Sequence, residues 1–106
     1  MKKNEINILI KRPGSDTWEP RKVKNDLHTL QELVDGYIEI VNIGHHVVVV
    51  CDEEGRIKGK PFCATINDID FVGTVLMVGT KKDEFDDIPA SLVADGFLKG
   101  AVKYAN

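Results

Sequence analysis

The sequence predicts an α+β domain: a mainly antiparallel sheet of five or six strands with one helix packed on it. Several short segments alternate apolar and polar residues, which is the period of a half-buried strand. The unbroken valine run Val47–Val50 is typical of a central strand buried on both faces. Two segments have helical spacing, and 106 residues suffice for a single domain over 1–106.

The first predicted unit is a hairpin. Residues Glu5–Lys11 alternate, and turn-forming residues follow at Pro13–Asp16. The return strand, Trp18–Val23, contains Pro20. Because proline cannot donate a ladder hydrogen bond, we expect this strand at an edge of the sheet.

The strongest helical pattern covers about residues 26–35. Asn25 or Asp26 can cap its start, and we expect Gly36 to end it in the left-handed conformation. A helix this short is marginal alone, so its apolar stripe must pack on the sheet. The stripe consists of Leu27, Leu30, Leu33 and Val34.

The middle of the chain predicts strands at Tyr37–Ile43 and His46–Cys51, joined by a turn at Gly44-His45. The tight acidic loop Asp52–Arg56 contains Gly55, which we expect at a position that needs positive φ.

Beyond this loop, residues Ile57–Lys60 are predicted to pair back weakly, and a polar stretch follows Pro61. The next predicted strand is Val72–Val78. Residues Lys81–Asp87 are interpreted as a charged, exposed loop.

A second, C-terminal helix is predicted over about residues 89–104. A small sheet covers only part of its apolar face, so we expect a homodimer that buries Phe97, Leu98 and Val102.

Composition narrows the class of protein. Apolar residues make up 42%, charged residues 29%, and the net charge is −3. That balance is typical of a globular domain and disfavours binding of the whole domain to nucleic acid. No segment approaches the roughly 20 apolar residues of a membrane span, and no signal-peptide core is present. We therefore expect a cytoplasmic protein with no membrane association.

The sequence offers few parts for catalysis. It has no nucleophile-elbow, phosphate-loop, dinucleotide-binding or zinc-protease motif. Cys51 and Cys63 read as reduced, buried thiols, and alternation along the strand sends His45 and His46 to opposite faces. We predict no catalytic residues, no metal site and no cofactor.

Charge is unevenly distributed. Residues 1–24 carry seven Lys or Arg against three Asp or Glu, and the remainder of the chain is acidic. This basic hairpin has two interpretations: solvated strands whose lysines guard an edge, or a binding surface for a phosphate-bearing ligand such as a nucleotide. The second interpretation places the ligand between the basic hairpin, with Arg21 and Lys22, and one of three further surfaces: Tyr37, Trp18 or a dimer seam.

Three blocks of residues resemble a known family. The run Leu30–Glu39 is the most recognisable, followed by Glu53–Arg56 with Gly59 and Pro61, and by Val72–Thr74 with Val78-Gly79. Together they resemble the family called domain of unknown function 3846, over roughly residues 5–88. That family occurs mainly in phages, mobile elements and low-GC Gram-positive bacteria, and it has no agreed activity.

The resemblance implies a small accessory protein of phage or mobile-element type. With no catalytic parts and an acidic balance, our leading hypothesis is a non-enzymatic module that binds a protein partner. The alternative is a protein that binds a nucleotide or another small phosphate ligand through the basic hairpin. An enzyme and a nucleic-acid binder rank below both.

Overall fold

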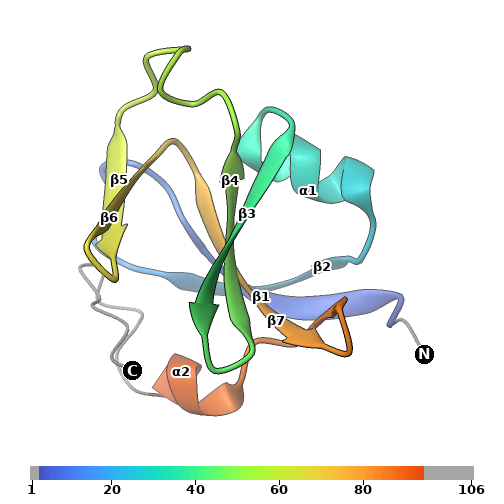
Figure 1. Ribbon diagram of the computed structural model, residues 1–106. Helices are drawn as coiled ribbons and strands as arrows, with labels where there is room; N and C mark the ends of the chain where they lie inside the picture. The colour runs from blue at the N-terminus through green and yellow to red at the C-terminus, as the bar shows by residue number, and fades with distance from the viewer. Residues whose placement is uncertain (1–2, 95–106) are drawn as a thin grey trace.

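The computed structural model describes residues 3–94. It contains an antiparallel sheet of six strands in the order β2-β1-β7-β4-β3, with β8 paired to the far end of β7, and a separate two-stranded sheet, β5-β6. Two short helices accompany the sheets, so the predicted α+β class is confirmed (Figure 1). The elements are β1 (Glu5–Lys11), β2 (Glu19–Lys24), α1 (Leu27–Val34), β3 (Ile38–Gly44), β4 (Val47–Asp52), β5 (Phe62–Ile66), β6 (Ile69–Val72), β7 (Val75–Lys81), β8 (Glu84–Asp86) and α2 (Ala90–Ala94).

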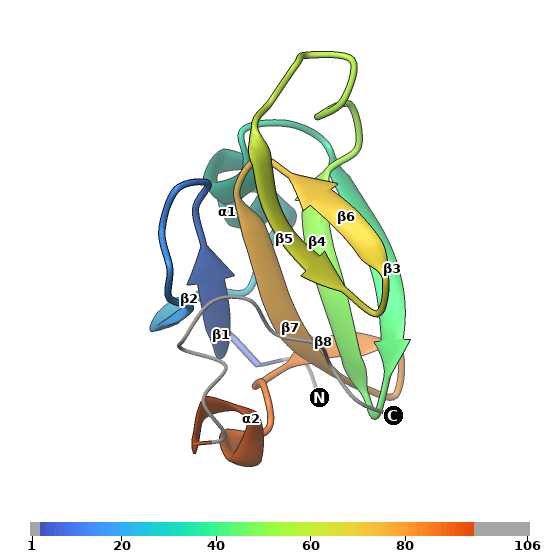
Figure 2. The same ribbon diagram turned by 90° about the vertical axis from the view of Figure 1, so that its left-hand side faces the viewer.

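The large sheet is buried on both faces. On one face α1 inserts Leu30 and Val34 between the side chains of β1, β4 and β7. On the other face the β5–β6 hairpin packs against Val49 and Met77. Figure 2 shows the hairpin in front of the sheet and α1 behind it. The valine run Val47–Val50 of β4 therefore contributes alternate side chains to both cores, as predicted.

Helix α1 begins and ends close to its predicted limits. The Asp26 carboxylate accepts a hydrogen bond from the Thr29 N–H at 2.8 Å, which is the expected N-cap. The expected C-terminal glycine conformation is wrong, because Asp35 and not Gly36 adopts the left-handed conformation, with φ 57°. Gly36 has a different role: a Cβ there would collide with the Asp52 carboxylate.

The structure corrects several predicted boundaries in the second half of the chain. Ile57–Lys60 forms turns and no strand. The predicted polar stretch contains β5, and β6 and β7 are separate strands divided at Gly73-Thr74. The predicted charged loop contains β8. Gly55 is another correction: it lacks positive φ, and its missing Cβ leaves room for Val72.

Three hairpins share one kind of turn. At His45-His46, Asn67-Asp68 and Lys82-Asp83, both central residues have positive φ and neither is glycine. Two-residue turns with that backbone match the twist of the flanking strands. The first turn lies one residue beyond its predicted position.

At the C-terminal end of the described chain, α2 covers the start of the predicted second helix, and the remainder of that helix lies outside the described residues. Within residues 3–94, no helix has both the length and the apolar character needed to cross a membrane.

Candidate functional site: the β3 edge and its anchor

The two cysteines are buried thiols. Burial, followed by the nearby Glu39 and Asp52 charges, raises the pKa of Cys51 to about 11. Burial also raises the pKa of Cys63, whose Sγ lies 3.4 Å from the Lys11 carbonyl oxygen and donates to it. Both thiols are therefore protonated at neutral pH and are poor nucleophiles.

Metal-ligating side chains do not gather in the described part of the chain. There, no group of three or more His, Cys, Asp or Glu residues could hold an ion. His45 and His46 are exposed in the β3–β4 turn.

Among the ion pairs of residues 3–94, the most buried carboxylate lies at the C-terminal end of α1. The Asp52 side chain is only 1% exposed, and its Oδ2 lies 2.8 Å from Lys60 Nζ and 2.9 Å from Lys58 Nζ. Its Oδ1 accepts a hydrogen bond from the Glu54 N–H. Burial alone would raise the Asp52 pKa, but these hydrogen bonds outweigh it and lower the pKa to about 2.

The same two lysines also bind the backbone carbonyl groups at the C-terminal end of α1. Lys60 Nζ donates to the carbonyl oxygens of Val34 and Asp35 at 2.9 and 2.8 Å, and Lys58 Nζ donates to the Asp35 carbonyl at 3.2 Å. Cations at this position satisfy carbonyls that the helix leaves unpaired and oppose its negative dipole end. We call Asp52, Lys58 and Lys60 the anchor cluster, because it fixes the chain where α1 turns into β3.

The glycines of the family-like blocks support the same region. Gly36 lies against the Asp52 carboxylate, and a Cβ on Gly73, where φ is 73°, would lie 2.8 Å from the Lys60 side chain. The Gly73 N–H donates to the Pro61 carbonyl at 2.8 Å. These residues therefore build the anchor cluster and have a structural role.

The four predicted ligand residues do not form one surface. Trp18 is 1% exposed and belongs to the core on the hairpin face of the sheet. Arg21 and Lys22 lie on β2 at one edge of the sheet, whereas Tyr37 precedes β3 at the opposite edge. Of the four residues, the structure therefore brings together only Arg21 and Lys22, and the phosphate-ligand hypothesis stays a prediction.

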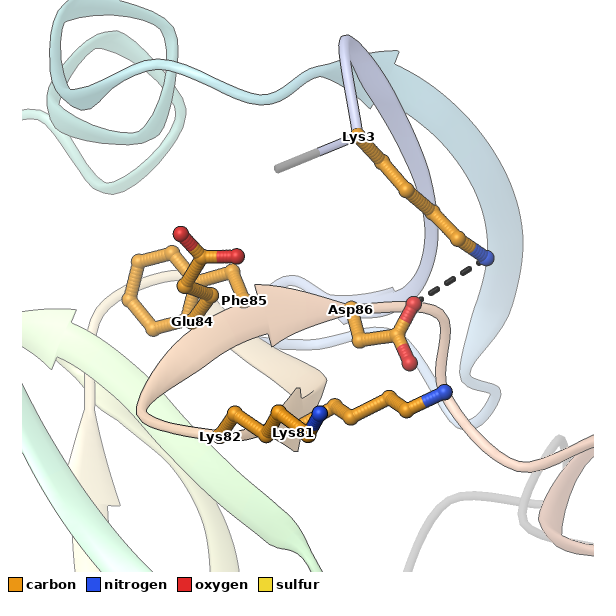
Figure 3. Close-up of a pocket in the computed structure, with 6 residues that line it drawn as sticks. All are labelled: Lys3, Lys81, Lys82, Glu84, Phe85 and Asp86. Atoms are coloured by element: carbon orange, nitrogen blue, oxygen red, sulfur yellow. Dashed lines mark ion pairs between the residues drawn. The ribbon is translucent and has the colours of Figure 1, made fainter. Parts of the chain in front are cut away.

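A hollow beside Lys3 contains three lysines but does not form a phosphate site. Lys3, Lys81, Lys82, Glu84, Phe85 and Asp86 line it, and Figure 3 shows the Lys3 ammonium directed at the Asp86 carboxylate. Lys3 Nζ lies 3.0 Å from Asp86 Oδ1 and 2.7 Å from Asp87 Oδ2. These carboxylates and Glu84 offset the lysines, so the hollow lacks the positive excess that a phosphate requires.

The outer side of β3 has backbone groups that no other described strand binds, and the sequence did not predict this open edge. The Glu53 N–H donates to the Tyr37 carbonyl, and the β3–β4 register continues from this pair. Hydrogen-bonded pairs alternate in an antiparallel ladder, so Glu39 and Val41 bond to β4. The intervening residues Ile38, Ile40 and Asn42 direct their backbone N–H and C=O groups away from β4, where no described strand pairs with them.

Hollows flank this edge on both faces of the sheet. On the helix face a hollow of about 690 Å³ includes Ile40, Val48 and Phe85 among its lining residues. On the hairpin face a smaller one includes Glu39, Val41 and Ile57. Tyr37, Ile40 and Ile57 are 68%, 50% and 86% exposed, so large apolar side chains surround the open backbone groups.

Sequence reasoning missed this edge because strand order is a long-range property. The only local signal was the absence of proline and lysine from 38–44, in contrast to β2. The predicted dimer residues Phe97, Leu98 and Val102 lie outside the described residues, and that interface stays a prediction.

Comparison with known proteins agrees with the sequence resemblance. The chain matches no curated protein and no solved structure at a significant level. A family model does match residues 6–99, which include the anchor cluster, the β3 edge and both sheets. The chain therefore belongs to the family described as Domain of unknown function (DUF3846).

Proposed function

We propose that this protein is a non-enzymatic protein-binding module that accepts a strand of its partner along the β3 edge. The observation that carries the proposal is the outward-directed backbone of Ile38, Ile40 and Asn42 beside exposed apolar side chains. In strand addition, main-chain hydrogen bonds supply affinity and flanking pockets supply specificity.

The chemistry of the described residues supports a binding role over catalysis. The thiols have raised pKa values, and the most buried carboxylate is engaged by two lysines and a backbone N–H. A general acid or base needs a pKa near neutrality and access to substrate, and Asp52 has neither. The setting that we propose, an accessory protein of phage or mobile-element type in the cytoplasm, rests on the distribution of the family.

A pair of substitutions at one position tests the proposal. Ile40→Pro removes an N–H that points away from β4, so it blocks strand addition without removing a hydrogen bond of the fold. Ile40→Val is the matched control, since it keeps both the N–H and an apolar β-branched side chain. Tagged wild type, Ile40→Pro and Ile40→Val are incubated with lysate of the cell that carries the gene, after urea unfolding has confirmed comparable stability.

We expect the wild type and Ile40→Val to retain the same stoichiometric protein and Ile40→Pro to lose it. Equal retention by Ile40→Pro would overturn the β3 edge as the binding surface. Recovery of small molecules with no stoichiometric protein would overturn the binding module itself.

A further inference from the structure

We infer that the strand accepted at the β3 edge is a basic extended segment of a partner protein, in which lysine or arginine side chains alternate with apolar ones. This inference rests on the proposed function and adds the chemistry of the partner. Because β3 has seven residues, a fully paired segment would extend over about 23 Å.

The alternation follows from the two faces that flank β3. Side chains of a docked strand point alternately to opposite faces of the sheet, as those of β3 do. On the hairpin face they would border a hollow in which four carboxylates and one arginine lie among apolar side chains. On the helix face they would border Ile40 and Phe85, and the opposite charges of Lys82 and Asp83 there offset each other. One face therefore favours positive charge, and the other favours apolar groups.

The charge near the start of β3 is strongly one-sided. Two hollows adjoin this part of the strand, and of the described residues that line them, seven are carboxylates and two are Lys or Arg. Both cations have internal partners: Lys58 pairs with Asp52, and Arg56 Nη2 donates to the Asp70 carbonyl at 2.6 Å. The carboxylates in these hollows are Glu32, Asp35, Glu39, Asp52, Glu53, Glu54 and Asp70.

The exposed members of this set have their charge available to a partner. Glu39 and Glu53 are exposed and form no ion pair with another described residue. Asp35 pairs with Lys60 at 3.8 Å, but its side chain is 95% exposed and still faces solvent. Charge complementarity steers the encounter and selects the register of a docked strand more than it adds affinity. It also disfavours a second copy paired β3 to β3, because that arrangement would bring two acidic surfaces together.

The β2 edge of a second copy is basic, but it lacks the required backbone. Pro20 has no N–H to donate, so a β2 strand docked on β3 would leave an acceptor unpaired. A basic segment of another protein without that proline satisfies both the charge and the hydrogen-bonding requirement.

Synthetic peptides test the inference without knowledge of the partner. The probe is a nine-residue, end-capped peptide of alternating lysine and valine. One control alternates glutamate and valine, and a second has the lysines and valines in two separate blocks. Binding to the full chain is measured by titration calorimetry, and the site by backbone amide chemical shifts, for wild type, Ile40→Pro and Ile40→Val.

We expect the alternating lysine peptide to bind wild type and Ile40→Val at least tenfold more tightly than either control peptide. Its amide shifts should centre on β3, Ile40→Pro should weaken binding at least tenfold, and added salt should weaken it further.

Three outcomes would overturn the inference, and they differ from failure of the proposed function. Equal or tighter binding of the glutamate peptide, still sensitive to Ile40→Pro, leaves strand addition intact and contradicts the basic partner. Concentration-dependent dimerisation that Ile40→Pro abolishes assigns the edge to a second copy. Lysine-peptide binding that is insensitive to Ile40→Pro removes the β3 edge from both proposals.

Discussion

The two edges of the large sheet are built in opposite ways. At β2, the Asn25 N–H donates to the Asn4 carbonyl, and the register from this pair leaves Pro20, Lys22 and Lys24 with outward-directed backbone. Pro20 has no N–H to donate, and the other two residues are lysines. Proline and lysine are the usual means by which an edge strand avoids pairing with a further strand. At β3, the outward-directed residues are two isoleucines and an asparagine.

The difference between β2 and β3 shows that an edge strand of this sheet does not accept a further strand merely because it lies at the edge. Both edge strands have similar lengths and one partner each, so their exposure to new strands is decided by side chains and by one proline. The open edge is also the one whose start is fixed by the anchor cluster. A rigid edge loses less conformational entropy when it binds than a mobile one does.

Removal of the Asp52 carboxylate should have the largest effect on the difference between the two edges, because the anchor cluster fixes the start of β3. Asp52→Ala leaves two lysines without their buried carboxylate, and loss of one partner from a buried ion pair costs about 4 kcal/mol of unfolding free energy. Urea denaturation measures the total loss. Amide hydrogen exchange should show the largest fall in protection at α1 and β3, and a smaller fall at β1 and β2.

The matched control is Glu53→Ala, at the exposed neighbour of Asp52, which should change stability by less than about 0.5 kcal/mol. If Asp52→Ala cost less than about 1 kcal/mol, the cluster would not be an anchor.

A proline placed at either of two adjacent positions tests which backbone groups face outward. The Glu39 N–H bonds to β4, so Glu39→Pro should destabilise the fold by about 3 kcal/mol through a lost hydrogen bond and an unpaired acceptor. Ile40→Pro should cost less than about 1 kcal/mol, because its N–H faces outward. Urea unfolding of both variants gives the comparison, and a larger cost at position 40 would invert the assignment of the edge.

Acid should loosen the anchor without any substitution. The folded-state pKa of Asp52 is about 2, below its ordinary value of 3.8, so its contribution to stability is complete above pH 5 and is lost as pH falls from about 4 to about 2. The lost contribution is about 2 kcal/mol. Wild type should therefore exceed Asp52→Asn in stability at pH 6, and this excess should shrink by about that amount at pH 2.

Other carboxylates titrate in the same range and set the background of that measurement. The Thr29 N–H lowers the pKa of Asp26, and Lys3 lowers the pKa of Asp87. Both are present in Asp52→Asn, so the difference between the two proteins isolates Asp52. An unchanged difference between pH 6 and pH 2 would contradict the assigned role.

The sequence predicted those elements whose structure is decided by residues close together along the chain. Helix α1 was predicted from its leucine spacing and capping aspartate, and β4 was predicted from its valine run. The β5–β6 and β7–β8 hairpins were missed because their turns are Asn67-Asp68 and Lys82-Asp83, where the expected signal was glycine. The pairing of Ile66 with Ile69, and of Lys81 with Glu84, closes these turns and holds their central residues at positive φ.

The candidate site was out of reach for a related reason. Gly36 and Gly55 looked like residues chosen for backbone conformation, but they are small because Asp52 and Val72 approach them from distant strands. Trp18 looked like part of a surface beside Arg21 and Lys22, and the fold buries it in the core. Only the three-dimensional arrangement shows that β3 has a free side.

Opening of the β2 edge is the smallest change in stability and the sharpest test of the comparison. Pro20→Thr with Lys22→Thr restores a donor and removes one charge, and we expect less than about 0.5 kcal/mol of change in unfolding free energy. The variant should associate with increasing concentration, which light scattering measures, because β2 of one copy can now pair with β3 of the next. Arg21→Thr is the control, since the backbone groups of Arg21 bond to β1, and it should leave the mass unchanged.

A contact between β2 of one copy and β3 of the next is heterologous, so each such contact uses one β2 edge and one β3 edge. Addition of Ile40→Pro to the double variant should therefore return it to the mass of the wild type, and continued association would show that another surface joins the copies.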